Sequence, residues 1–155
     1  MFKSDDKKIK SKAFIDIHAP VLNYRSRITL PKTRNWDYST YSGYRMFPNL
    51  FQPVQTRKVR VPNRIKYAAT EDNFNSHDGF VTDRDVAYIR ERARGVVGGI
   101  CTIQGVYMDP KGEGKGYVGQ AAAWNDKFVP GLKRLADVIH EEGAVANCQC
   151  MHACG

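Results

Sequence analysis

An alternation of strand-like and helix-like segments is the feature that most limits how this 155-residue chain can fold. Residues 64–69, 99–105 and 145–151 are typical of buried strands, and a helical spacing of apolar residues fills each interval between them. The order is therefore strand, helix, strand, helix, strand. Repeated crossovers of this kind give parallel strands with right-handed connections, so we expect an α/β fold with a parallel sheet.

Two amphipathic helices are predicted between the strands. The first covers 83–94, with Thr82 as its N-cap and Gly95 as its stop. The second begins at 125–126 and ends at Gly143. The side chains that we expect on the buried faces are Val86, Ile89 and Ala93 in the first helix and Phe128, Leu132, Leu135, Ala136 and Ile139 in the second.

The basic character of the chain, a formal net charge of +8, belongs to its N-terminal part. Residues 1–64 carry a net charge of +10, whereas 65–155 carry −2. Residues 1–46 show no sustained periodicity, so we divide the chain into a basic, aromatic-rich extension and an α/β part, 47–155, which opens with a short hairpin at 54–61. The extension is either a solvated tail or an arm that docks through its aromatic rings. No motif supports binding to nucleic acid.

Composition excludes several other classes of protein. With 42% apolar and 26% charged residues, the chain is neither disordered nor collagen-like. No apolar run approaches the roughly 20 residues that span a bilayer, so we expect a cytoplasmic protein without membrane contact. The spacing of Cys148, Cys150 and Cys154 matches no usual zinc or iron–sulfur pattern. We therefore expect no metal site and structural thiols, with Cys148 and Cys150 buried in an alternating, strand-like run and Cys101 in the strand at 99–105.

Five segments occur in the order in which one enzyme family carries them. They are Asn63-Arg64-Ile65 preceded by 50–54, Asp78-Gly79-Phe80-Val81-Thr82-Asp83, residues 92–100, residues 128–140, and Gln149-Cys150-Met151-His152-Ala153-Cys154-Gly155. Together they make 47–155 similar to the old yellow enzyme family, in particular its branch of 2,4-dienoyl-CoA and 2-enoate reductases.

The resemblance implies that 47–155 is the N-terminal portion of a (β/α)₈ barrel, with about three strands and two helices. Because a full barrel needs about 250 residues, we expect the remaining strands to come from a missing segment or a partner chain. The family binds FMN at the carboxyl ends of the strands and passes hydride from NADH or NADPH through the flavin to an activated alkene, here an enoate or enoyl-CoA. Catalytic residues, and any iron–sulfur cluster, are expected only in the missing C-terminal part.

Carried over position by position, the resemblance implies five flavin contacts. Ala68, Ala69 and Thr70 would lay their backbone along the isoalloxazine ring. Gly105 would lie against its pyrimidine side. Gln149, whose amide can both donate and accept, matches the carbonyls and N–H of the pyrimidine edge.

Two residues depart from the family pattern. Glu71 stands where the family often has a Cys or Thr that tunes the flavin, and a carboxylate there would repel the reduced, anionic ring. Gln104 stands where a Glu is common. His152 matches a family histidine and is expected to be structural.

The alternative to an enzyme is a non-catalytic half-barrel, a scaffold or assembly subunit that pairs with a partner chain.

Overall fold

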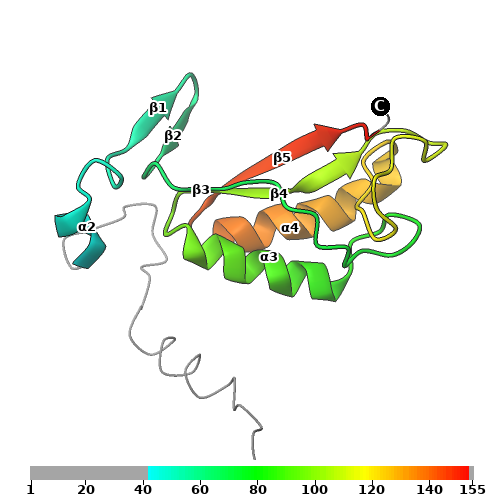
Figure 1. Ribbon diagram of the computed structural model, residues 1–155, viewed down its shortest axis with the longest axis horizontal. Coiled ribbons are helices and arrows are strands. Elements are labelled where there is room, and N and C mark those ends of the chain that lie inside the picture. The colour runs from blue at the N-terminus through cyan, green and yellow to red at the C-terminus, as the bar shows by residue number, and fades with distance from the viewer. Residues whose placement is uncertain (1–41, 154–155) are drawn as a thin grey trace, which may run out of the picture.

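The computed structural model describes residues 42–153 (Figure 1). Its elements are α2 (Ser42–Met46), β1 (Val54–Thr56), β2 (Val59–Val61), β3 (Lys66–Tyr67), α3 (Asp83–Gly95), β4 (Ile100–Tyr107), the 3₁₀ helix η1 (Asp126–Phe128), α4 (Val129–Glu141) and β5 (Val145–Met151). Most of the predicted extension, 1–41, lies outside the described residues. Its last part, which we expected to be irregular, forms the short helix α2.

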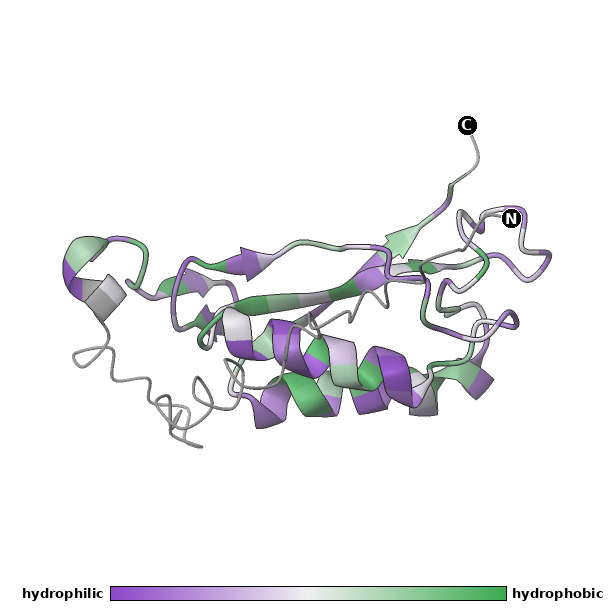
Figure 2. Ribbon diagram, turned by 60° about the horizontal axis from the view of Figure 1, so that its bottom comes forward, coloured by the Kyte–Doolittle hydropathy of each residue, from purple (hydrophilic) through white to green (hydrophobic). Residues whose placement is uncertain are grey.

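The predicted order of strands and helices is confirmed. β3, β4 and β5 form a parallel sheet in that order, so β4 is the central strand. Helices α3 and α4 lie side by side on one face of the sheet (Figure 1), and polar and apolar residues alternate along both (Figure 2). No helix in 42–153 covers the opposite face. The structure is thus a partial α/β layer rather than a closed barrel.

The hydrophobic core lies between β4 and the two helices. Its centre is formed by Ile89 and Ala93 of α3, Cys101 of β4, and Leu135 and Ile139 of α4, each with no more than 1% of its surface exposed. Four of these five residues are among those predicted from helical spacing. Burial of one large aliphatic side chain contributes about 1.5–3 kcal/mol, so this cluster is the main attachment of the helices to the sheet.

The helix ends agree with the predictions except at Gly95. The Oγ1 of Thr82 accepts a hydrogen bond from the N–H of Asp85 at 3.4 Å, which confirms the N-cap. Gly95 is the last helical residue rather than the stop. The chain reverses at Val97 and Gly98, where φ is +50° and +86°. Glycine occupies left-handed backbone without the steric cost of a Cβ, and so the second of these positions completes the turn.

The first strand is shorter and more exposed than predicted. We expected a buried strand over 64–69, but only Lys66 and Tyr67 pair with β4. Lys66 is exposed and Tyr67 is half-buried, its hydroxyl 2.9 Å from that of Tyr88 on α3. β3 is an edge strand in this sheet, with β4 on one side only, and the chain leaves the sheet at Ala68. These two facts explain the exposure.

The predicted hairpin at 54–61 is confirmed, whereas the predicted burial of Cys148 and Cys150 is wrong. β1 and β2 pair antiparallel and stand apart from the parallel sheet (Figure 1). Cys101 is buried as expected, but Cys148 and Cys150 are exposed because β5 is the other edge strand. Cys154 lies outside the described residues. Within 42–153, no three His, Cys, Asp or Glu side chains gather as a metal ion would require.

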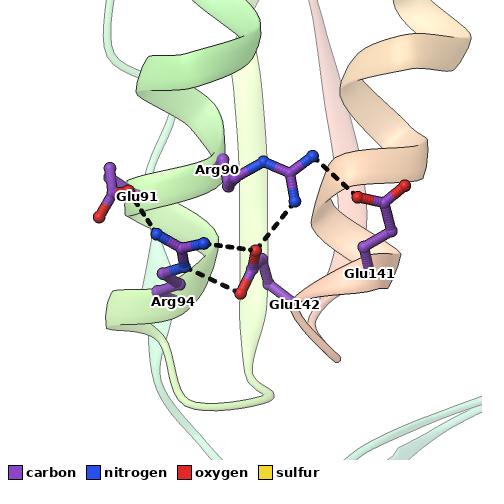
Figure 3. A network of polar contacts seen from close by, with 5 residues as sticks. All are labelled: Arg90, Glu91, Arg94, Glu141 and Glu142. Carbon is purple, nitrogen blue, oxygen red and sulfur yellow. Dashed lines mark hydrogen bonds and ion pairs between the residues drawn. The ribbon is translucent and has the colours of Figure 1, made fainter. Parts of the chain in front are cut away.

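A network of charged side chains joins the outer surfaces of α3 and α4 (Figure 3). Glu142, 14% exposed, accepts hydrogen bonds from Arg90 at 3.0 Å and from Nε of Arg94 at 3.0 Å. Arg90 also contacts Glu141 at 2.8 Å. A shared, partly buried carboxylate holds two guanidinium groups better than isolated surface pairs would. In the part of the chain described, neither these helices nor any other has the length and apolarity that crossing a membrane requires.

Gly99 gives a direct test of how β3 is attached. A Cβ on Gly99 would lie 2.2 Å from the carbonyl oxygen of Ile65 and 2.4 Å from Oδ1 of Asn63. Buried Asn63 itself donates to the carbonyls of Val96 and Val97. Gly99→Ala must therefore push β3 from β4, and we expect it to lower the free energy of unfolding by about 1–3 kcal/mol in urea titrations.

Gly95→Ala is the matched control. No atom outside its own helix and neighbours lies within 4 Å of a Cβ at Gly95, so this variant should be as stable as the wild type or slightly more stable. Equal stability of the two variants would contradict the packing described at Gly99.

Candidate functional site

The candidate site lies where the three parallel strands end. Because β3, β4 and β5 run in the same direction, their carboxyl ends and the loops that follow them meet at one edge of the sheet (Figure 1). In parallel α/β structures this edge is where ligands bind.

All five predicted residues lie in or directly after these strands. Gly105 on β4 and Gln149 on β5 are direct partners in the register of the sheet. Ala68, Ala69 and Thr70 follow β3, on the opposite side of β4. Ala68, Thr70 and Gln149 are exposed and Ala69 is half-buried. The side chain of Gln149 forms no hydrogen bond within the described part of the chain, so its amide is available to a ligand.

The peptide groups of Gly105 are held from both sides by side chains. Oε1 of Glu71 accepts from its N–H at 2.9 Å, and Nε2 of Gln120 donates to its carbonyl at 2.7 Å. Gln120 in turn accepts from the N–H of Gly116 at 2.7 Å. A Cβ on Gly105 would lie 2.7 Å from Oε1 of Glu71 and 3.1 Å from Sδ of Met151. The space that glycine leaves is therefore filled by protein side chains.

Glu71 carries an unusual carboxylate. Burial raises its pKa, the hydrogen bond from Gly105 lowers it, and the nearby charge of Asp72 raises it again. Its second oxygen, Oε2, is buried without a hydrogen-bond partner among the described residues. Since an unsatisfied buried oxygen is costly, this group is sensitive to any charge that arrives beside it.

Gln104 occupies a β-bulge that the sequence analysis missed. The register between β4 and β5 shifts between Ile103 and Gly105, and Gln104 is the extra residue, with no exposed surface. Its Nε2 donates to Oδ2 of Asp85 at 3.1 Å and to Oδ1 of Asp72 at 3.3 Å. Its Oε1 accepts from the N–H of Ala121 at 3.2 Å.

The amide explains the departure from glutamate at Gln104. An amide donates through nitrogen and accepts through oxygen, so it serves two carboxylates and one backbone N–H together. A glutamate would place a third carboxylate beside Asp72 and Asp85. The sequence showed the replacement of Glu by Gln at position 104. It could not show the hydrogen-bond partners of this amide, because they lie in distant segments of the chain.

Asp85 is the fully buried member of this cluster. Burial raises its pKa to about 7, and the charge of Asp72 adds to the effect; the hydrogen bond from Gln104 lowers it. Its Oδ1 has no hydrogen-bond partner in the described residues. The folded state therefore favours the protonated carboxyl, which can donate a hydrogen bond that the carboxylate cannot.

This arrangement predicts how stability changes with pH. The pKa of Asp85 rises from 3.8 to about 7 on folding, so its contribution is complete below 3.8 and is lost as pH rises through about 7. Asp85→Asn reproduces the protonated form. We expect this variant to unfold at a higher temperature than the wild type at pH 8, with a flatter dependence of Tm on pH.

Asp78→Asn is the control for this test, because the Asp78 side chain is 83% exposed. It should leave the pH profile of Tm unchanged. If Asp85→Asn unfolds at the same or a lower temperature than the wild type at pH 8, the buried carboxyl is not held as described.

Comparisons with known proteins identify the family of the chain. The family model described as NADH:flavin oxidoreductase / NADH oxidase matches residues 49–155. The NADH oxidase of Thermoanaerobacter brockii is 34% identical over 107 residues, which are 69% of this chain and 16% of that protein. The chain thus spans about a sixth of the length of this relative.

Two solved structures extend the comparison. The complex of 2-naphthoyl-CoA reductase with 2-naphthoyl-CoA is 47% identical, with a TM-score of 0.65, and the match covers 69% of this chain and 16% of that one. The old yellow enzyme of Pichia sp. AKU4542 is 24% identical, with a TM-score of 0.60 over 67% of this chain and 26% of that one, a likeness in fold. The chain therefore belongs to the NADH:flavin oxidoreductase / NADH oxidase family, that of the old yellow enzymes.

Proposed function

We propose that this chain provides the first three strands of an FMN-binding (β/α)₈ barrel. The whole enzyme, in this proposal, reduces an activated C=C bond with hydride from NADH or NADPH. The observation that carries the proposal is the pairing of Gly105 with Gln149 at the carboxyl edge of the sheet, with Ala68–Thr70 following the neighbouring strand. Three segments distant in the sequence thereby meet at one edge of the sheet.

The residues at this edge fit a flavin. Small side chains at Ala68 and Ala69 allow a planar ring to approach the backbone. The free amide of Gln149 can donate to a carbonyl and accept from an N–H of the pyrimidine edge. Bound FMN would supply the hydride relay between the nicotinamide and the alkene.

Glu71 and Gly105 change the surroundings that a flavin ring would meet at this edge. Because Glu71 and Met151 fill the space beside the Cα of Gly105, a ring would meet their side chains there rather than an open glycine. The carboxylate of Glu71 would disfavour a reduced, anionic ring by charge repulsion. We infer a flavin that is harder to reduce than one next to a neutral Cys or Thr.

The substrate class follows from the relatives. The 47% identical reductase is solved with an aryl-CoA thioester, and the NADH oxidase takes its name from a nicotinamide donor. We propose an enoate or enoyl-CoA as substrate, as in the 2,4-dienoyl-CoA and 2-enoate reductases. Any iron–sulfur cluster would belong to the C-terminal part of the enzyme.

The outer edge of β5 supports a partner. β5 pairs with β4 alone in the described part of the chain, so one row of its backbone groups is free to extend the sheet. We propose that another segment or chain adds the remaining strands there.

Residues 1–46 would form an extension separate from this barrel portion. The thiols of Cys101, Cys148 and Cys150 are free, in keeping with a reducing cytoplasm.

Replacing Gln149 tests the flavin site. The protein is assembled by co-expression with a segment that carries the remaining strands, and FMN affinity is measured from flavin fluorescence. Gln149→Leu removes one or two hydrogen bonds, at about 1 kcal/mol each, so we expect FMN to bind roughly five- to thirty-fold more weakly.

Gln55→Leu, an exposed amide on the separate hairpin, should bind FMN as the wild type does. Wild-type affinity in the Gln149 variant would overturn the assignment of this residue. An assembly that forms without any flavin absorbance would instead favour the non-catalytic scaffold.

A further inference from the structure

A hollow lies at the same end of the sheet as the candidate flavin residues and includes none of them. It is a pocket of about 660 Å³ at the end of β4, within the range of pockets that hold small ligands. Its walls come from the loop before α3, the long loop after β4 and the start of η1, which lie together at one end of the sheet (Figure 1). Every wall belongs to this chain, so the pocket does not depend on the remaining strands.

The pocket is basic. Lys111, Lys115 and Lys127 line it, and Asp78 is the one carboxylate among its lining residues. None of these lysines forms an ion pair with a carboxylate in the described part of the chain. Lys115 is held by a hydrogen bond from its Nζ to the carbonyl of His77. With three lysines and one aspartate, the lining carries a net positive charge, which favours an anion that carries several charges.

The pocket also presents flat aromatic surface. Phe80 and Tyr117 line it and are 43% and 52% exposed, and Trp124 forms a further part of the wall. The Nζ of Lys127 lies 4.5 Å from the centroid of the Trp124 ring and 5.7 Å from that of Phe80. Positive charge and aromatic faces are thus combined within one hollow.

We propose that this pocket binds a phosphorylated adenosine, with the base on the aromatic rings and the phosphates on the lysines. Stacking on exposed Phe80 or Tyr117 suits a flat heterocycle. The proposal rests on the proposed function and deepens it, because that function supplies two molecules with such a group. One is the phosphorylated ADP of a CoA thioester, and the other is the ADP portion of the nicotinamide donor. Tyr107, the last residue of β4, lines the pocket, so either molecule bound there would lie next to the carboxyl end of this strand.

The test is equilibrium binding to the full 155-residue chain without flavin, followed by calorimetry. The probes are adenosine 3′,5′-bisphosphate for the CoA source, ADP-ribose for the nicotinamide source, and adenosine and inorganic phosphate as the separate halves. We expect at least one of the two phosphorylated nucleosides to bind saturably, and at least ten-fold more tightly than either half. Preference for the bisphosphate assigns the pocket to the thioester, and preference for ADP-ribose assigns it to the nicotinamide donor.

Lys111→Gln with Lys127→Gln should weaken binding ten-fold or more, and rising salt should weaken it further. Lys58→Gln with Lys133→Gln removes the same charge outside the pocket and should change affinity less than two-fold. Tyr117→Ala, which alters an exposed side chain, gives a second measurement if the double lysine variant does not fold; it should also weaken binding.

The proposal is overturned if neither phosphorylated nucleoside saturates, or if both lysine pairs weaken binding equally, which would indicate attraction to net charge alone. Gln149→Leu separates this proposal from the flavin site. It should leave nucleotide affinity unchanged, so failure of FMN binding and failure of nucleotide binding are distinguishable.

Discussion

The pairing of β4 on both of its edges is the constraint on which the rest of the structure depends. β4 is buried along all but its first residue. β5 pairs along its length, β3 pairs with its first two residues, and side chains of Glu71 and Gln120 bond the peptide groups of Gly105. The helices pack on its side chains, and both the candidate flavin residues and the basic pocket are arranged at its end. A strand in this position can carry polar side chains only where each finds a partner.

The bulge at Gln104 shows how that requirement is met. Its amide forms hydrogen bonds with Asp72, Asp85 and the N–H of Ala121, and so links the loop after β3, helix α3 and the loop after β4. The next residue, Gly105, is then fixed by Glu71 and Gln120. Buried polar contacts from distant segments therefore determine the shape of the edge to which we assign the flavin.

The regular elements could be predicted from the sequence because their signals are local. Thr82 marks the start of α3, and the spacing of Ile89, Leu135 and Ile139 identifies the buried faces. The exposure of a strand residue depends instead on which strands lie beside it, and this is where the predictions were wrong. Cys148 reads as buried in an alternating run, but it is exposed because no described strand lies beyond β5.

The candidate site divides in the same way. The resemblance to a family supplied Gly105 and Gln149, which are partners in the register of β4 and β5. The partners of Gln104 and the filling of the space at Gly105 could not be predicted, since Asp72, Asp85 and Met151 approach from other elements. The basic pocket was missed for the same reason, as its lysines are divided between the loop after β4 and η1, and no motif connects them.

An experimental structure of the chain, assembled with its remaining strands and loaded with FMN, tests the central claim most directly. The account predicts the isoalloxazine ring at the carboxyl ends of β3, β4 and β5, with the Gln149 amide at its pyrimidine edge and a fourth strand paired with the outer edge of β5. A ring held elsewhere, or an assembly in which that edge stays unpaired, would contradict it.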